Sequence, residues 1–117
     1  YMVCPGNHDV FYRFESYAKT FAMPVATGGE GLTGNGQWWA MGYGETYFVA
    51  INTEELYEPF SPQHTWLENT LRSYSQNLRS LFPWLIVFGH RPPYCSNAWE
   101  WCNGDFSRTL LRESTES

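Results

Sequence analysis

A strand, a long helix and a second strand follow one another in the middle of the chain, and this order constrains the fold more than any other feature. Residues 45–52 are mostly apolar and predict a strand. Ser61 and Pro62 then provide a helix start, and apolar side chains recur at three- and four-residue spacing as far as residue 81. Residues 84–88 form another apolar run. The pattern predicts a βαβ crossover, right-handed by default, and therefore an α/β fold.

Further elements are predicted on either side of this unit. Residues 1–4 are predicted to be a buried strand, residues 13–21 a short helix, and residues 37–43 a strand in a hairpin with residues 45–52. Residues 26–36 and 91–105 contain many turn-forming residues and are expected to be loops. A chain of 117 residues with these elements is long enough for one domain with a hydrophobic core.

The composition excludes several classes of partner. A net charge of −5 argues against a nucleic-acid backbone as partner. No apolar run approaches the ~20 residues that a membrane-spanning helix needs. We therefore predict no nucleic-acid partner and no membrane segment in this chain. The negative charge does not exclude a phosphate substrate, because bound metal ions would reverse the local field.

Two of the predicted strands end in turns that carry metal-binding side chains. Residues 6–9 read Gly-Asn-His-Asp, and residues 87–90 read Val-Phe-Gly-His. Open α/β sheets build their sites just beyond the ends of strands. Asn7 offers an amide oxygen, His8 and His90 offer imidazoles, and Asp9 offers a carboxylate, all of which can bind a metal ion. The sequence therefore predicts a site at which these two turns meet.

These motifs resemble those of the purple acid phosphatases, within the calcineurin-like metallophosphoesterases. The resemblance extends to residues 90–97, which read His-Arg-Pro-Pro-Tyr-Cys-Ser-Asn as in animal-type members, and to Ile-Asn-Thr-Glu at residues 51–54. It spans nearly the whole chain. The fold that it implies is α/β, as part of a four-layer α/β/β/α metallophosphoesterase sandwich.

The resemblance also implies an activity, namely hydrolysis of small phosphate monoesters at acidic pH. Asn7 and His90 would bind the divalent ion of a binuclear centre that pairs Fe³⁺ with Zn²⁺, Mn²⁺ or Fe²⁺. Two metal ions stabilise the charge that develops on the phosphate oxygens. His8 would be catalytic, contacting the phosphate and assisting departure of the alcohol as a general acid. Asp9 has two open roles: it either accepts a hydrogen bond from the turn backbone or orients His8.

Other motifs of the family, Asp-x-Gly, Gly-Asp-x-x-Tyr and Gly-His-x-His, do not occur in this sequence. We therefore expect residues 1–117 to be a partial catalytic domain, truncated at both ends and inactive in isolation. Two alternatives stay open: another calcineurin-like phosphoesterase, such as a nucleotidase or phosphodiesterase, or a non-catalytic truncated module. Arg91 either meets the substrate phosphate or pairs with a carboxylate near its loop, and we favour the pair.

The cysteines give the first testable prediction. Of the three cysteines, Cys95 and Cys102 lie in one polar loop after His90, whereas Cys4 lies in the predicted first strand. We expect a disulfide between Cys95 and Cys102, a reduced Cys4, and an extracellular or lysosomal/vacuolar location. Closing so short a loop should stabilise the fold by roughly 2–3 kcal/mol. Mass spectrometry of non-reduced peptides tests this, and free thiols at both loop positions in secreted material would contradict it.

Overall fold

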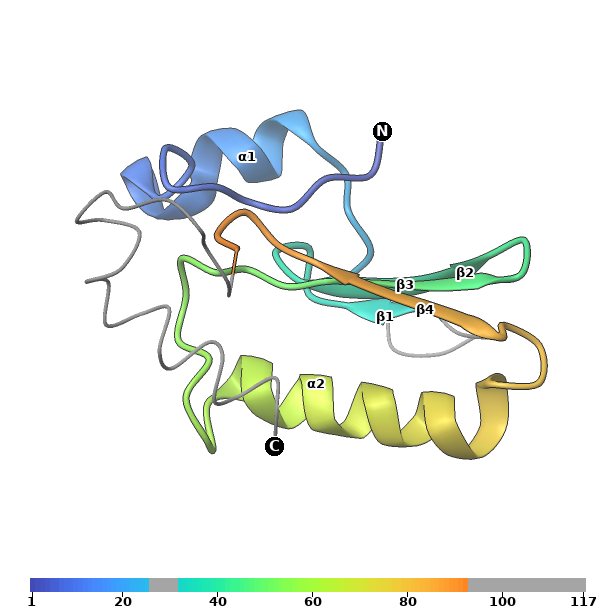
Figure 1. Cartoon of the computed structure of the whole chain (residues 1–117). Helices are drawn as coiled ribbons and strands as arrows, with labels where there is room; N and C mark the ends of the chain where they lie inside the picture. Colours follow the sequence, from blue (N-terminus) through green and yellow to red (C-terminus); the bar gives the residue numbers. More distant parts are fainter. Residues whose placement is uncertain (26–31, 93–117) are drawn as a thin grey trace, which may run out of the picture.

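One mixed sheet lies between two helical layers in the structure, a computed structural model that describes residues 1–25 and 32–92 (Figure 1). The N-terminal segment and α1 (Glu15–Thr20) lie on one face of the sheet, and α2 (Pro62–Ser73) runs across the other. This arrangement confirms the predicted α/β class, while the four-layer sandwich stays a prediction. Within the described ranges, no helix is both long and apolar enough to cross a bilayer.

The sheet contains four strands in the order β1-β2-β3-β4. Strands β1 (Thr33–Gly34), β2 (Trp39–Tyr43) and β3 (Thr46–Ala50) are antiparallel neighbours, and β4 (Trp84–Phe88) pairs with β3 in parallel. The predicted hairpin and the predicted crossover are therefore confirmed. The short strand β1 lies in a stretch that was expected to be a loop. At the hairpin turn Gly44 has a φ of 58°, a conformation that favours glycine.

Helix α2 begins where the sequence predicts. The Ser61 side chain accepts a hydrogen bond of 3.2 Å from the backbone N–H of His64 and so caps the first turn. After Ser73 the helix continues as a wider π-type turn, Tyr74–Leu78. The Tyr74 ring stacks on Tyr47 of β3, with the ring centroids 5.3 Å apart. A core of Ala40, Tyr47, Val49, Ile51 and Tyr74 thus joins this helical layer to the sheet.

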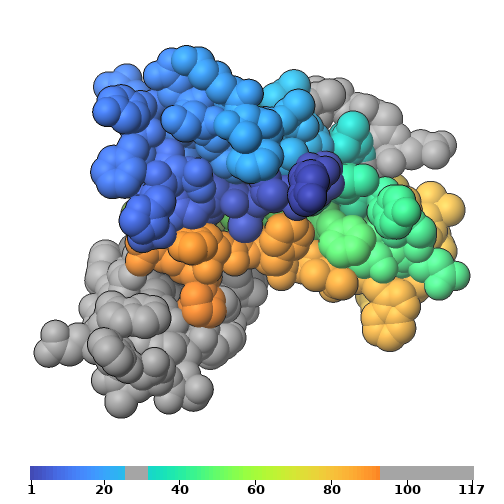
Figure 2. All heavy atoms as spheres, turned by 90° about the horizontal axis from the view of Figure 1, so that it is seen from above, coloured from blue at the N-terminus to red at the C-terminus, as the bar shows by residue number. Residues whose placement is uncertain are grey.

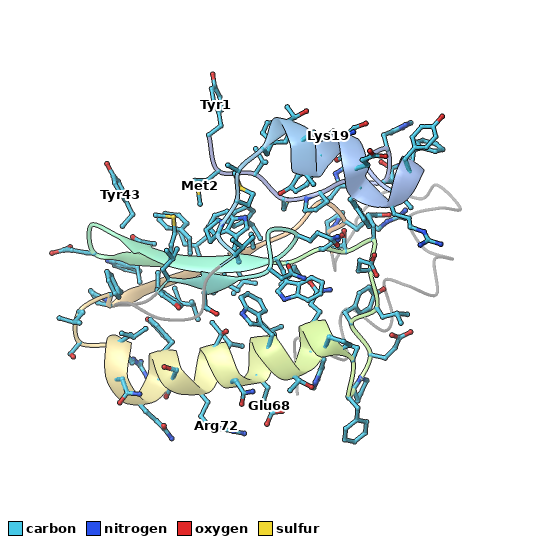
Figure 3. All side chains as sticks on the ribbon, turned by 180° about the vertical axis from the view of Figure 1, so that it is seen from behind. Tyr1, Met2, Lys19, Tyr43, Glu68 and Arg72 are labelled. Carbon is cyan, nitrogen blue, oxygen red and sulfur yellow. The ribbon has the colours of Figure 1, made fainter. Side chains whose placement is uncertain are left out.

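The opposite face of the sheet packs on the N-terminal segment through Trp39, which is 1% exposed and meets Phe88 edge-on at 5.6 Å. Its neighbour Trp38, just before β2, instead contacts Trp66 of α2, so the adjacent tryptophans lie on opposite faces of the sheet. Beyond α1 this face carries an apolar groove of about 500 Å³, beside the labelled Met2 and Tyr43 in Figure 3. The groove is lined by Met2, Trp39, Met41, Tyr43, Phe48, Ile86 and Phe88.

The strand predicted at residues 1–4 is wrong. The Val3 N–H donates to the sulfur of Met23 at 3.4 Å. The Val3 carbonyl accepts hydrogen bonds from the Tyr17 hydroxyl at 3.1 Å and from Trp39 Nε1 at 2.8 Å. Side chains thus satisfy the backbone groups that a neighbouring strand would otherwise satisfy. The segment is anchored to the sheet without being part of it.

The helix predicted for residues 13–21 is shorter than expected. It covers Glu15–Thr20 and is preceded by a 3₁₀ turn, Phe11–Phe14. Three consecutive residues, Tyr12, Arg13 and Phe14, have φ between 54° and 63°. Such angles are unfavourable for residues with a side chain, so the packing of the segment must enforce them. The buried Phe14 side chain, 3% exposed, provides that packing.

The contact between Tyr17 and Val3 predicts a pH-dependent stability. Burial, together with smaller contributions from the nearby Cys4 and Asp9, raises the pKa of Tyr17 from 10.0 to about 12. The folded state therefore favours the neutral phenol. The stability that the neutral Tyr17 phenol contributes to the fold is complete below about pH 10. It is lost as the pH rises from about 10 to about 12.

We expect Tyr17→Phe to lower the free energy of unfolding by about 1 kcal/mol at pH 8, because the hydrogen bond to the Val3 carbonyl is lost. The variant should also lose less stability than the native chain between pH 10 and pH 12. Urea denaturation at each pH measures both effects. Tyr43→Phe is the matched control, because Tyr43 is 75% exposed. Equal alkaline losses in the native chain and in Tyr17→Phe would contradict the assignment.

Candidate functional site

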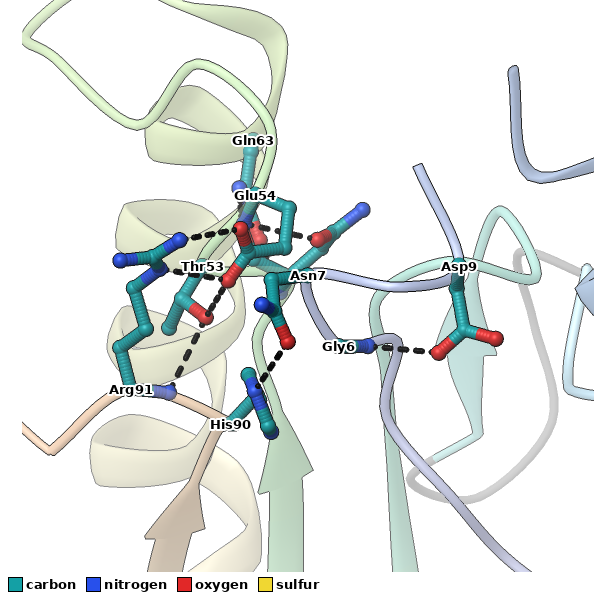
Figure 4. A network of polar contacts seen from close by, with 9 residues as sticks. Gly6, Asn7, Asp9, Thr53, Glu54, Gln63, His90 and Arg91 are labelled. Atoms are coloured by element: carbon teal, nitrogen blue, oxygen red, sulfur yellow. Dashed lines mark hydrogen bonds and ion pairs between the residues drawn. The ribbon is translucent and has the colours of Figure 1, made fainter. Parts of the chain in front are cut away.

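Residues 6–9 form a tight turn that is closed by its own carboxylate (Figure 4). The Asp9 N–H donates to the Gly6 carbonyl at 2.9 Å, and the Gly6 N–H donates to Asp9 Oδ2 at 2.8 Å. Of the two roles left open for Asp9, the structure shows the bond to the turn backbone. The turn leaves the side chains of Asn7 and His8 exposed. It therefore presents an amide and an imidazole from one short segment.

His90 comes from the far end of the described chain to meet this turn. Its Nε2 lies 3.0 Å from Asn7 Oδ1, although the residues are 83 positions apart in sequence. In the tautomer with a proton on Nε2, the imidazole donates to the amide oxygen. Seen from above in Figure 2, the blue N-terminal residues lie directly against the orange residues that follow β4. The two predicted metal ligands are therefore brought together.

Gly6 allows the imidazole to come this close. A Cβ added at Gly6 would lie 3.1–3.2 Å from three atoms of the His90 ring, which is tighter than ordinary van der Waals contact. The ring therefore rests on the backbone of the turn that carries Asn7. The glycine of the Gly-Asn-His-Asp motif has a steric role here, in addition to any role in forming the turn.

The ends of the two parallel strands are packed together behind His90. The Ile51 N–H donates to the Phe88 carbonyl at 2.9 Å, which extends the pairing of β3 and β4 by one residue. A Cβ at Gly89 would lie 2.9 Å from Thr53 Cγ2 and 3.0 Å from Ile51 Cγ1. Only a residue without a side chain fits at this crossing of the two chain segments. The sheet edge at which His90 emerges is thus tightly defined.

A buried polar network anchors the segment after β3. Gln63, in the first turn of α2, accepts a hydrogen bond from the Asn52 N–H at 2.7 Å and donates to the Asn52 carbonyl at 2.9 Å. Asn52 Oδ1 in turn accepts the Glu54 N–H at 3.0 Å. In the part of the chain that the structure describes, no buried polar side-chain atom lacks a partner. A fully satisfied network of this kind holds its members in one arrangement.

Arg91 joins that segment to the turn at His90. Its guanidinium makes two bonds to Glu54, Nε to Oε1 at 2.8 Å and Nη2 to Oε2 at 3.0 Å. Its backbone N–H donates to Thr53 Oγ1 at 3.2 Å. The predicted pairing of Arg91 with a carboxylate is confirmed. Sequence reasoning missed Thr53 and Glu54 as its partners, although both directly follow a strand predicted to run parallel to the one that ends at His90.

The donor atoms of Asn7 and His90 fit two neighbouring positions around one metal ion. Two ligands about 2.1 Å from a cation and at right angles to each other are about 3.0 Å apart. The two atoms are 3.0 Å apart, and both side chains are exposed. Among residues 1–25 and 32–92, no group of three or more His, Cys, Asp or Glu side chains is placed to hold a metal. The spacing of these two donor atoms is therefore compatible with part of a coordination shell and not with a complete one.

The other residues singled out in the sequence are His8 and the three cysteines. His8 is exposed, and its ring centroid lies 6.3 Å from that of Phe11. Cys4 is a free, half-buried thiol, and burial raises its pKa. Cys95 and Cys102, with the predicted disulfide, lie outside the described residues.

The fold is α/β, and it brings the turn that carries Asn7 against His90, which follows β4. A family model described as calcineurin-like phosphoesterase matches residues 1–115, and the chain belongs to this family.

Comparison with individual proteins shows which members of this family the chain resembles. The chain is 38% identical over 104 residues to acid phosphatase type 7 of Mus musculus, covering 84% of this chain and 22% of that protein. The identity and coverage are the same for acid phosphatase type 7 of Homo sapiens. It is 29% identical over 118 residues to purple acid phosphatase 21 of Arabidopsis thaliana, covering 95% of this chain and 26% of that protein. The resemblance drawn from the motifs is thereby confirmed, over roughly a quarter of the length of these relatives.

The packing of His90 on Gly6 yields a prediction about geometry. We expect Gly6→Ala to displace the imidazole and lengthen the distance from His90 Nε2 to Asn7 Oδ1, while stability changes by less than about 1 kcal/mol because the exposed ring can move. Gly44→Ala is the control. An added Cβ at Gly44 would meet nothing within 4 Å, but the φ of 58° is unfavourable for alanine. It should cost about 1–2 kcal/mol without moving His90. Denaturation and histidine NMR distinguish the two, and an unmoved ring in Gly6→Ala would contradict the packing.

Proposed function

We propose that the protein to which this chain belongs hydrolyses phosphate monoesters at acidic pH with a binuclear metal centre. The observation that carries the proposal is the meeting of Asn7 Oδ1 and His90 Nε2 at 3.0 Å, from motifs 83 positions apart. The similarity to proteins named acid phosphatase type 7 and purple acid phosphatase supports the same reaction.

Asn7 and His90 would hold the divalent ion of this centre, which we propose to be Zn²⁺, Mn²⁺ or Fe²⁺ beside Fe³⁺. The remaining ligands would come from outside these two residues. When bound, the metal pair supplies positive charge to the phosphate oxygens as negative charge develops on them. Because an amide and a neutral imidazole are uncharged, they add no negative charge that would repel an anionic phosphate.

His8 is proposed as the general acid. Its imidazole is exposed on the same short turn as Asn7, so it can face a phosphate ester held beside that residue. In its protonated form an imidazole can donate a proton to the oxygen of the departing alcohol. Arg91 is less suited to holding the phosphate, because its guanidinium makes two bonds to Glu54. We assign it to the structure of the site.

An extracellular or lysosomal/vacuolar location is proposed on one ground besides the family resemblance. A disulfide between Cys95 and Cys102 would form and persist only in an oxidising compartment.

Substitutions in the intact protein test these roles. We expect Asn7→Ala and His90→Ala each to lower the content of divalent metal and the turnover of an aryl phosphate. His8→Ala should keep its metal and lose roughly 10²–10⁴-fold in kcat, the usual contribution of a general acid. Metal analysis alongside kinetics separates the two kinds of role.

The third histidine of the chain provides the matched control. His64 lies in the first turn of α2. His64→Ala should therefore change neither metal content nor turnover. If His8→Ala lost as much metal as His90→Ala, its assignment as the general acid would fail. Hydrolysis of a phosphodiester in preference to an aryl phosphate monoester would overturn the proposed substrate class.

A further inference from the structure

The side chain of His90 is exposed, so its own packing fixes it weakly. Its ring rests on Gly6 and meets Asn7, both of which belong to a different part of the chain. The direction in which the ring emerges therefore depends on the backbone on either side of residue 90. On one side the backbone is held by the close packing of Gly89 against Ile51 and Thr53. The backbone on the other side, at Arg91, must be held by different contacts.

We propose that Glu54 and Thr53 are positioning residues, which fix the peptide that follows His90 and thereby aim the imidazole at Asn7. The Arg91 N–H belongs to that peptide and donates to Thr53 Oγ1 at 3.2 Å. The Arg91 side chain is gripped by both oxygens of Glu54 at 2.8 and 3.0 Å. Thr53 Oγ1 also donates to Glu54 Oε1 at 3.1 Å, so the two positioning residues are themselves linked. Figure 4 shows these contacts beside the His90 ring.

Burial distinguishes this ion pair from an ordinary surface pair. The side chain of Glu54 is 6% exposed and that of Arg91 is 36% exposed. By contrast, Glu68 and Arg72 lie on the outer face of α2, each 56% exposed and joined by a single bond of 2.5 Å (Figure 3). A bidentate pair with a desolvated carboxylate specifies geometry, whereas a solvated single bond between long side chains does so poorly. The chain thus offers a positioning pair and a matched control of the same chemistry.

A buried hydrogen-bond network holds Glu54 in place and so fixes its ion pair with Arg91. The Glu54 N–H is held by Asn52, and Asn52 by Gln63 of α2, through bonds of 2.7–3.0 Å. Asn52 is 0% exposed and Gln63 is 1% exposed. These hydrogen bonds therefore connect the position of His90 to the first turn of α2, rather than to a surface loop. Supporting contacts of this kind decide whether a site is held tightly or is loose by about 1 Å.

The inference deepens the proposed function, since it concerns a proposed metal ligand. Its test measures side-chain geometry in the intact protein, stripped of metal and without substrate. A failure of the phosphatase proposal would leave that measurement unaffected, so the two can fail separately.

The readout is the NMR cross-relaxation between the His90 ring protons and the Gly6 Hα protons, whose intensity falls with the sixth power of distance. In the native chain it should be strong, because a Cβ at Gly6 would lie 3.1–3.2 Å from the ring. We expect Glu54→Gln, which keeps the shape and removes the charge, to weaken it roughly fivefold, as a displacement of about 1 Å would. Glu68→Gln should leave it unchanged.

A second pair of variants does not depend on the ion pair. Thr53→Val removes the acceptor of the Arg91 N–H at nearly constant shape and should weaken the same signal. Thr53→Ser keeps the hydroxyl but lacks the methyl beside Gly89, and it should give a stronger signal than Thr53→Val. If Glu54→Gln does not fold, this pair decides the question. A native-strength signal in folded Thr53→Val would overturn the proposal. An equal loss in Glu68→Gln would overturn it too, because the effect would then be a general one.

Discussion

The parallel pairing of β3 with β4 is the interaction on which the rest of the structure depends. It places the ends of both strands at one edge of the sheet, where the Ile51 N–H still bonds to the Phe88 carbonyl at 2.9 Å. The segment after β3 is thereby brought beside the segment after β4. Without this pairing, Glu54 and Arg91 would be opposite charges 37 positions apart with no reason to meet. The polar contacts of the site are a consequence of the topology.

The N-terminal segment completes the site by a different physical route. It is tied to the sheet by the Val3 carbonyl, which accepts bonds from Tyr17 and Trp39, and not by a strand ladder. Trp39 is also a core residue, packed edge-on against Phe88 near the end of β4. The core that stabilises the fold therefore also sets the distance between the turn at Asn7 and the exit at His90. Packing and site geometry are coupled through the same side chains.

Sequence reasoning succeeded where a local pattern is sufficient to specify the structure. The hairpin around Gly44 needs a glycine at positive φ, and α2 needs the cap at Ser61, so both could be predicted from a few neighbouring residues. It failed at residues 1–4, whose apolar run is equally suited to a strand or to an extended segment held by side chains. The choice between them depends on where Tyr17 and Trp39 lie, which no local pattern contains.

By itself, the sequence determined the α/β class, the candidate ligands Asn7 and His90, and the expectation that Arg91 pairs with a carboxylate. The α/β class follows from residue types and short spacings, and the choice of Asn7 and His90 follows from the resemblance of their motifs to those of a known family. Only the tertiary structure decided that the carboxylate is Glu54, that Thr53 holds the backbone of Arg91, and that the His90 ring rests on Gly6. The reason is that these contacts join segments distant in the chain, and their distances are fixed by how strands and helices pack.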